Sequence, residues 1–211
     1  MALNQRIEMK EQIWGSVETR NESPSPKLEI YKEPSFVETV RNRIYFYSDI
    51  YRAEVLQLNR RLREVNNDLL FEAQVQDREP ASIFLHINSF GGSVFAGLSA
   101  MDEICNSKVK ITTIVDGISA SAATFLSVAG TERLIRPHAY MLIHQLSSAF
   151  WGKFAEFEDQ KKNLDTLMDT IKNIYKEYTK IPVEKLDEIL QHDLYFDAQT
   201  CVDYGLVDKI A

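Results

Sequence analysis

Short segments with the pattern of β-strands alternate with helical segments along most of this chain, and this alternation limits the folds open to it. Strand patterns lie at residues 43–47, 83–87, 110–115, 133–135 and 140–143. Helical patterns occupy residues 53–71, 94–106, 122–129, 155–178, 182–192 and 198–204. Because strands that alternate with helices are typical of βαβ units, we predict an α/β fold with a mainly parallel sheet.

The first forty residues lack this pattern. They are polar, weakly periodic and interrupted by Ser23-Pro24-Ser25-Pro26 and by Pro34. The chain has 211 residues, of which 45% are hydrophobic. The part of the chain after residue 40 is therefore long enough to build one core. We predict a partly flexible N-terminal extension over residues 1–40 and one folded domain over residues 41–211.

Charge and hydropathy exclude several classes of function. A net charge of -7 argues against nucleic-acid binding, because proteins that follow phosphate backbones carry a basic excess. No apolar run approaches the roughly 18 residues of a membrane span, so we predict no membrane association. The first thirty residues contain five glutamates and no continuous apolar signal segment, and we therefore expect a cytoplasmic location.

The two cysteines, Cys105 and Cys201, each lie within an apolar helical pattern. They have no CxxC spacing and no neighbouring group of metal ligands. We predict that both are buried thiols, and we predict neither a metal nor a cofactor.

Two glycine-containing turns each follow a predicted strand and open a helix, at residues 88–92 and 116–121. Amides at such positions are free to bind a ligand, and Gly91-Gly92 permits close approach of the backbone. An isolated Gly-Gly pair is more often a tight turn without function. Neither turn has the spacing of a phosphate-binding loop.

Three residues in this part of the chain could form a nucleophilic system, although each has an ordinary alternative. Ser121, with Ser119 as a competitor, stands at a helix start, where a serine taken alone is more often an N-cap than a nucleophile. His144 ends an apolar strand, where a lone histidine is more often structural. Asp193 follows a helix and could be a turn residue. A Ser/His/Asp triad requires that all three meet, which spacing does not show.

The motifs together resemble a known family. They are Ile87-Asn88-Ser89-Phe90-Gly91-Gly92, Gly117-Ile118-Ser119-Ala120-Ser121-Ala122-Ala123, Met141-Leu142-Ile143-His144-Gln145, and Asp193 followed by Tyr204-Gly205-Leu206-Val207-Asp208. In this order they are similar to ClpP, the proteolytic subunit of the caseinolytic protease, from about Arg43 to Ile210.

The resemblance implies a ClpP/crotonase-like fold of repeated β-β-α units, with a protruding handle of a strand and a long helix at about residues 145–180. It implies a serine endopeptidase with Ser121 as nucleophile, His144 as acid/base and Asp193 as its orienting carboxylate. Gly92 and Ala122 would supply the oxyanion amides. The family binds substrate as an added strand, which here would involve Gly91, Ser147, Ser148, Ala149 and Phe150.

The partners implied by the resemblance are further copies of the chain, as heptameric rings stacked into a tetradecamer, an AAA+ unfoldase of the Clp type, and polypeptide substrates. The sequence departs from the family pattern at Phe90, where proline is usual, and at Ser147-Ser148, which replace a glycine pair. His86 stands where an aromatic docking residue is usual. Some viral and plastid relatives diverge in this way, so host cytoplasm and plastid stroma are further expected locations.

Three alternatives stay open on the sequence. The chain could be a catalytically weak or inactive ring subunit that modulates a mixed Clp assembly, although it retains all three triad residues. It could be a crotonase-type enzyme that uses paired amides to hold an enolate, although such enzymes lack this triad. It could also be a viral capsid-processing protease.

Overall fold

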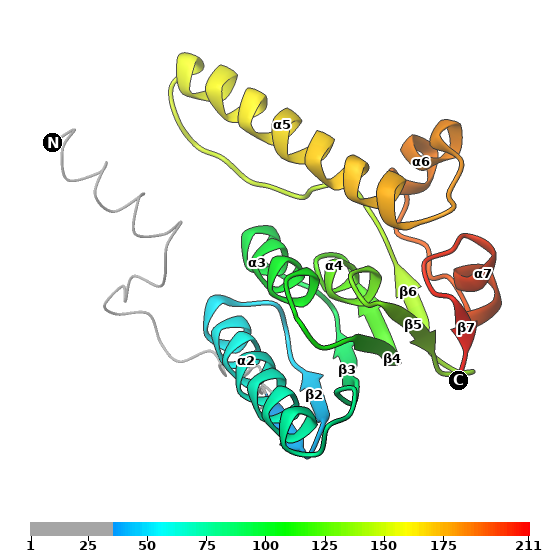
Figure 1. The fold of residues 1–211 in the computed structure, drawn as a ribbon. Coiled ribbons are helices and arrows are strands. Elements are labelled where there is room, and N and C mark those ends of the chain that lie inside the picture. Colours follow the sequence, from blue (N-terminus) through cyan, green and yellow to red (C-terminus); the bar gives the residue numbers. More distant parts are fainter. Residues whose placement is uncertain (1–35) are drawn as a thin grey trace, which may run out of the picture. The chain divides into compact units, whose positions relative to one another are not determined.

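The structure is a computed structural model that describes residues 36–211. Most of the expected N-terminal extension, up to residue 35, lies outside the described residues, and so does its predicted flexibility. The described part forms one compact unit. Its elements are arranged as a sheet with helices packed against it (Figure 1).

The sheet contains seven strands in the order β1-β2-β3-β4-β5-β7, with β6 paired to β4 outside this path. Their bounds are β1 Phe36–Val40, β2 Arg43–Tyr47, β3 Ile83–Ser89, β4 Ile111–Ala120, β5 Glu132–Ile135, β6 Tyr140–Leu142 and β7 Lys209–Ile210. All pairs are parallel except the β1–β2 hairpin. The predicted α/β class with a mainly parallel sheet is confirmed.

The helices of the described residues are α2 Arg52–Val75, α3 Val94–Cys105, α4 Ala123–Val128, α5 Phe154–Tyr178, α6 Val183–Leu190 and α7 Ala198–Asp203. The apolar residues of α2 recur at helical spacing, and the predicted stripe that includes Leu58, Leu62 and Leu69 is buried. On β3, Ile83, Leu85 and Ile87 point to the same face of the sheet and are fully buried in the core that this face forms with the helices. None of these helices has the length and apolar character of a membrane span.

Two strand predictions need correction. The segment 36–40, assigned to the extension, forms β1 and pairs with β2 along its whole length. The strand predicted at 110–115 continues as β4 to Ala120, through the stretch predicted as a turn. The pairing of β4 changes partner near Gly117, which has a φ of 95°. The first half of β4 pairs with β5, and its last three residues pair with β6.

The handle and one cysteine also differ from expectation. Residues 145–153, where the resemblance implies the handle strand before the long helix, form no regular structure, because no strand of the described chain pairs with them. The long helix α5 is present, as predicted, but its first half extends away from the sheet and buries no residue (Figure 1). Cys201 is buried as predicted, whereas Cys105 is exposed, because it is the last residue of α3.

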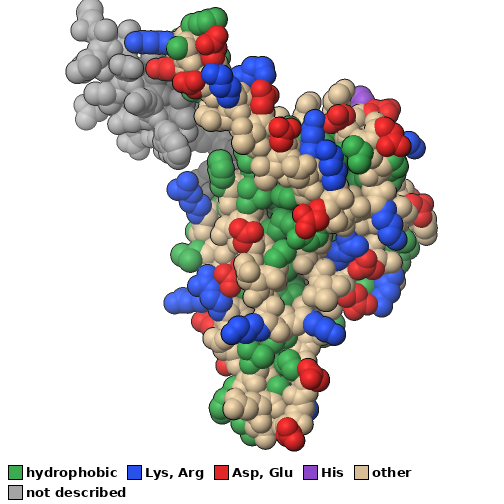
Figure 2. Space-filling view, turned by 45° about the horizontal axis from the view of Figure 1, so that its top comes forward, with side chains coloured by type: hydrophobic (Ala, Val, Ile, Leu, Met, Phe, Trp, Pro, Cys, Tyr) green, Lys and Arg blue, Asp and Glu red, His purple; other side chains and the backbone are tan. Residues whose placement is uncertain are grey.

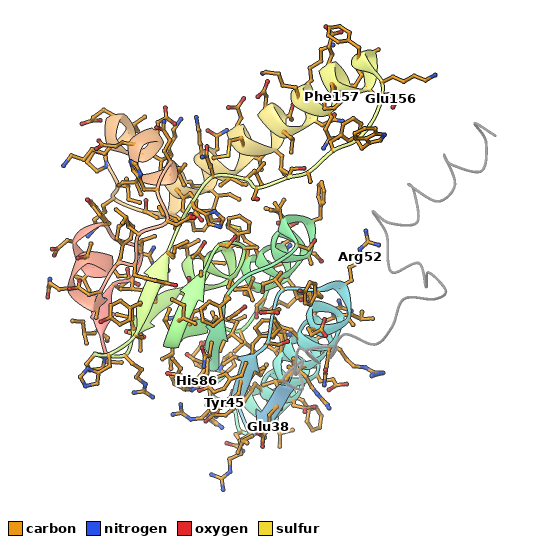
Figure 3. All side chains as sticks on the ribbon, turned by 180° about the vertical axis from the view of Figure 1, so that it is seen from behind. Glu38, Tyr45, Arg52, His86, Glu156 and Phe157 are labelled. Carbon is orange, nitrogen blue, oxygen red and sulfur yellow. The ribbon has the colours of Figure 1, made fainter. Side chains whose placement is uncertain are left out.

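A polar network joins the strands on the side of the sheet where His86 lies. Tyr45 and His86 face each other on neighbouring strands and their rings stack with centroids 4.5 Å apart (Figure 3). Asp116 accepts hydrogen bonds from His86 Nδ1 at 2.6 Å, from the Tyr47 hydroxyl at 2.9 Å and from Arg136 Nε at 3.0 Å. Burial and the Asp116 carboxylate raise the pKa of Tyr47 to about 12, so this phenol remains a donor.

Asp116 is expected to make stability depend on acid pH. Burial alone would raise its pKa, but hydrogen bonds from His86, Tyr47 and Arg136 outweigh burial and hold the pKa below its ordinary value. This carboxylate therefore stabilises the fold fully above its unfolded-state pKa, about 3.9, and the contribution is lost as pH falls through the lower folded value. Asp116→Asn should lower the free energy of unfolding in urea at pH 7 and flatten its fall below about pH 4.

The control for this measurement is Asp159→Asn, which changes the net charge equally. The Asp159 side chain is 78% exposed and lies 3.8 Å from Lys162. Exposed pairs of this kind contribute little, so the control should retain the wild-type urea midpoint at each pH. Equal behaviour of the two variants would contradict the role given to Asp116.

Candidate active site

Ser121 stands where β4 ends and α4 is about to begin. Its φ of 55° lies in the left-handed region, which residues other than glycine rarely adopt. The turn is fixed by hydrogen bonds: the Ser121 amide donates to the Leu142 carbonyl at 2.8 Å, and the Ser121 carbonyl accepts from the Thr124 amide at 3.0 Å. This sharp strand-to-helix turn presents the serine side chain to the pocket described below.

The Gly91-Gly92 turn packs directly against the Ser121 turn. A Cβ on Gly91 would lie 2.6 Å from the Ala120 oxygen and 2.7 Å from the Ser121 Cβ, so only glycine fits at this contact. Two backbone hydrogen bonds to Ile50 hold the Gly91-Gly92 turn on its other side. The Ile50 amide donates to the Gly91 carbonyl, and the Ile50 carbonyl accepts from the Ser93 amide, both at 2.8 Å. Within residues 36–211, the amides of Gly92 and Ala122 have no hydrogen-bond partner.

His144 lies two residues beyond β6, with about a quarter of its side chain exposed. The backbone beside it is held by a hydrogen bond from the Gln145 amide to the Leu190 carbonyl of α6. Asp193 follows α6, and its Oδ1 lies 3.5 Å from Nδ1 of His144. This separation is longer than an N–H···O hydrogen bond, and the Asp193 side chain is 79% exposed. The two side chains are therefore adjacent but do not form a hydrogen bond.

These turns and strand ends meet at one pocket of about 120 Å³. Ser121 and His144 line it together with Gly92 and Ala122, so the predicted nucleophile, the predicted acid/base and both predicted oxyanion residues converge there, and Asp193 lies beside His144. The rest of the lining comes from Val94, Phe125, Gln145, Leu146, Ser147, Ile171 and Tyr175.

The competitor Ser119 does not reach the pocket lining. It is fully buried within β4, and its hydroxyl donates to the Ser127 hydroxyl at 3.4 Å. Of the residues expected to bind substrate as a strand, Ser147 lines the pocket, and Gly91 packs against the Ser121 turn. The other three, Ser148, Ala149 and Phe150, are exposed.

Sequence reasoning missed the apolar wall contributed by α5. Ile171 and Tyr175 are buried one helical turn apart and face the pocket with Phe125 of α4. The sequence does show these two apolar residues four positions apart on a helix. This spacing predicts that one face of the helix is buried, but it does not predict which part of the protein that face contacts.

A serine hydroxyl, an imidazole and two free amides around one pocket are the groups that acyl transfer requires. The Clp protease family model matches residues 40–211. The chain belongs to the Clp protease family. It is 32% identical over 190 residues to the ATP-dependent Clp protease proteolytic subunit of Chlorokybus atmophyticus, covering 88% of this chain and 83% of that protein.

Two further members of the Clp protease family give the same picture. The protein of the same name from Ostreococcus tauri is 32% identical, over 88% of this chain and 94% of its own length. That from Deinococcus radiodurans is 33% identical, over 67% of this chain and 69% of its own. Within the described part of this Clp protease family member, no group of three His, Cys, Asp or Glu residues is arranged to hold a metal ion.

Proposed function

We propose that this chain is a serine endopeptidase subunit in which Ser121 is the nucleophile, His144 the general base and Asp193 the carboxylate that orients the imidazole. The observation that carries the proposal is the convergence of Ser121 and His144 with the amides of Gly92 and Ala122 on one pocket. Membership of a peptidase family supports the reaction class.

In the proposed reaction, Ser121 Oγ attacks the carbonyl carbon of a peptide bond while its proton passes to Nε2 of His144. The carbonyl oxygen takes the negative charge and accepts hydrogen bonds from the Gly92 and Ala122 amides. When the C–N bond breaks, the imidazolium returns the proton to the leaving amine. Water then attacks the acyl ester with the imidazole again as base, which restores the serine.

Substrate is proposed to lie along residues 146–150. This segment forms no strand in the described chain, so its backbone groups are available to pair with an added peptide strand. The apolar wall of Phe125, Ile171 and Tyr175 beside Ser121 fits an apolar side chain of the substrate next to the cleaved bond.

The direct test is to treat the purified protein with a fluorophosphonate and locate the adduct by peptide mass spectrometry. We expect one adduct on Ser121 and concurrent loss of peptide cleavage, because the phosphonyl group traps the activated serine. A stable protein that hydrolyses peptides without labelling at Ser121 would overturn the assignment.

Asp193→Asn tests the role given to Asp193. The amide keeps the size of the side chain but favours the wrong imidazole tautomer, so kcat should fall by about 10³- to 10⁴-fold with little change in melting temperature. Asp187→Asn on α6 is the control, because that carboxylate pairs with Lys172 and not with His144. Near-normal kcat in Asp193→Asn would contradict the triad.

Assembly with further copies of the chain, as stacked heptameric rings, is also part of the proposal. The segment leading into α5 and the first turn of this helix expose Trp151 at 70% and Phe154 at 80%. Phe157 packs edge-on against Phe150, and Figure 3 shows Glu156 and Phe157 at the end of α5 that is far from the sheet. Hydrophobic side chains stand beside charged ones on this projecting part (Figure 2). We call residues 150, 151, 154 and 157 the handle aromatics, and such a patch fits a second copy.

An ATP-driven unfoldase of the Clp type is the proposed partner for feeding polypeptides to the assembly, as the names of the relatives suggest. Phe84 is the aromatic residue that this chain offers on β3, and Arg43 lies over its ring, with the guanidinium carbon 4.6 Å from the centroid. His86 is bound by Asp116 and lies beneath Tyr45. The proposed docking surface is therefore more polar than the family pattern.

A further inference from the structure

Tyr175 connects the handle helix to the turn that carries Ser121. It lies near the end of α5 and is only 1% exposed, with its ring 6.2 Å from that of Phe125. Its hydroxyl is 2.7 Å from Oγ1 of Thr124, a fully buried residue of α4. Thr124 Oγ1 is in turn 2.6 Å from the carbonyl oxygen of Ser121.

The direction of these hydrogen bonds follows from counting protons. The Ser121 carbonyl can only accept, so the single proton of the Thr124 hydroxyl is donated to it. Thr124 Oγ1 must then accept from the Tyr175 hydroxyl. Burial raises the pKa of Tyr175, which keeps this phenol protonated and able to donate.

The Ser121 carbonyl and the Ala122 amide belong to one peptide unit. This unit is planar, and no peptide bond within residues 36–211 is cis, so its C=O and N–H point in opposite directions. Hydrogen bonds that fix the carbonyl therefore also fix the N–H. That N–H has no partner among the described residues and lines the pocket beside Ser121.

We propose that Tyr175 is a positioning residue: through Thr124 it holds the Ser121–Ala122 peptide so that the Ala122 amide points at the oxyanion. This inference rests on the proposed peptidase function. It makes the handle helix part of the catalytic framework, because the residue that orients one oxyanion donor is located on α5. A hydrogen bond that is fixed before reaction is most effective in the transition state, so its loss should lower kcat more than it raises KM.

The experiment compares Tyr175→Phe with the wild-type protein, using a short peptide substrate and a peptide boronate, which forms a tetrahedral adduct with an active serine. Tyr175→Phe should lower kcat about tenfold, equivalent to about 1.4 kcal/mol, with KM unchanged. The affinity for the boronate should fall by the same factor. Thr124→Val should lower kcat by at least as much, and Thr124→Ser should restore it.

A double variant tests the route of the effect. If Tyr175 acts through Thr124, adding Tyr175→Phe to Thr124→Val should cause no further loss of kcat. The matched control is Tyr178→Phe, which removes a phenol from the same helix where its oxygen lies 3.6 Å from Cys105 Sγ. This control should keep wild-type kcat and boronate affinity.

Three outcomes would overturn the inference. A purely structural hydroxyl would lower the melting temperature of Tyr175→Phe while leaving kcat and boronate affinity unchanged. Additive losses in the double variant would exclude the route through Thr124. Absence of fluorophosphonate labelling at Ser121 in the wild-type protein would remove the proposed function itself, and this result is obtained before any Tyr175 variant is compared.

Discussion

Ser121→Ala is expected to abolish fluorophosphonate labelling and to reduce peptide cleavage by at least about 10⁴-fold, the loss seen when a triad nucleophile is removed. The serine oxygen is the atom that forms the acyl intermediate, and no neighbouring group can replace it. The alanine variant should fold, because the hydrogen bonds that fix this turn are made by the Ser121 backbone. Circular dichroism and the melting temperature check that point.

Ser119→Ala is the matched control, since the two serines are separated by one residue. Its hydroxyl donates to Ser127 inside the sheet–helix layer and is fully buried, so its removal should cost about 1 kcal/mol of stability. Labelling and cleavage should remain. The reverse pattern, with labelling lost in Ser119→Ala and retained in Ser121→Ala, would show that the wrong serine has been assigned.

Removing two of the handle aromatics, Trp151 and Phe154, is the second change with a large expected effect. The wild-type protein should sediment as fourteen chains of 24.3 kDa, a particle of about 340 kDa. Trp151→Ser combined with Phe154→Ser should split it into species of half this mass or less, because these side chains are 70% and 80% exposed in the single chain. Peptide cleavage should fall as the particle dissociates. In the single chain, His144 Nδ1 and Asp193 Oδ1 are 3.5 Å apart, which is too far for a hydrogen bond that orients the imidazole.

Phe71→Ser controls for the loss of an exposed aromatic. Phe71 is 69% exposed on α2 and lies outside the handle. The control should keep the wild-type sedimentation coefficient and cleavage rate. A wild-type monomer that cleaves peptides at the full rate would contradict the proposed assembly, as would a handle variant that stays fully assembled.

Local patterns predicted the elements on which the candidate site is built. Ser121 before a helix and His144 after a strand could be placed from the sequence, because apolar runs mark these elements, although Gly117 lies within β4 and does not end it. β1 could not be placed, because its five residues follow a polar segment with prolines and become a strand only by pairing with β2. Its partner, and not its own pattern, determines its structure.

The remaining differences also depend on contacts that are remote in sequence. Thr124 and Tyr175 are separated by 51 positions, and no spacing rule brings their hydroxyls together. The resemblance predicts a handle strand in the stretch from residue 145 to the start of α5, yet a strand needs a neighbour to pair with. Cys105 satisfies an apolar pattern but occupies the final position of its helix, where the pattern no longer determines burial.

The buried hydroxyls around α4 have a consequence for how this chain can vary over evolutionary time. Thr113 donates to the Ser127 carbonyl, Ser119 donates to the Ser127 hydroxyl, and that hydroxyl donates to the Thr124 carbonyl. Loss of one member leaves a buried partner unsatisfied at about 1–3 kcal/mol, whereas joint replacement by apolar residues of the same shape can be nearly neutral. Substitutions in this layer should therefore be accepted in pairs. The effect of each substitution on stability then depends on whether its hydrogen-bond partner has already changed, which is epistasis.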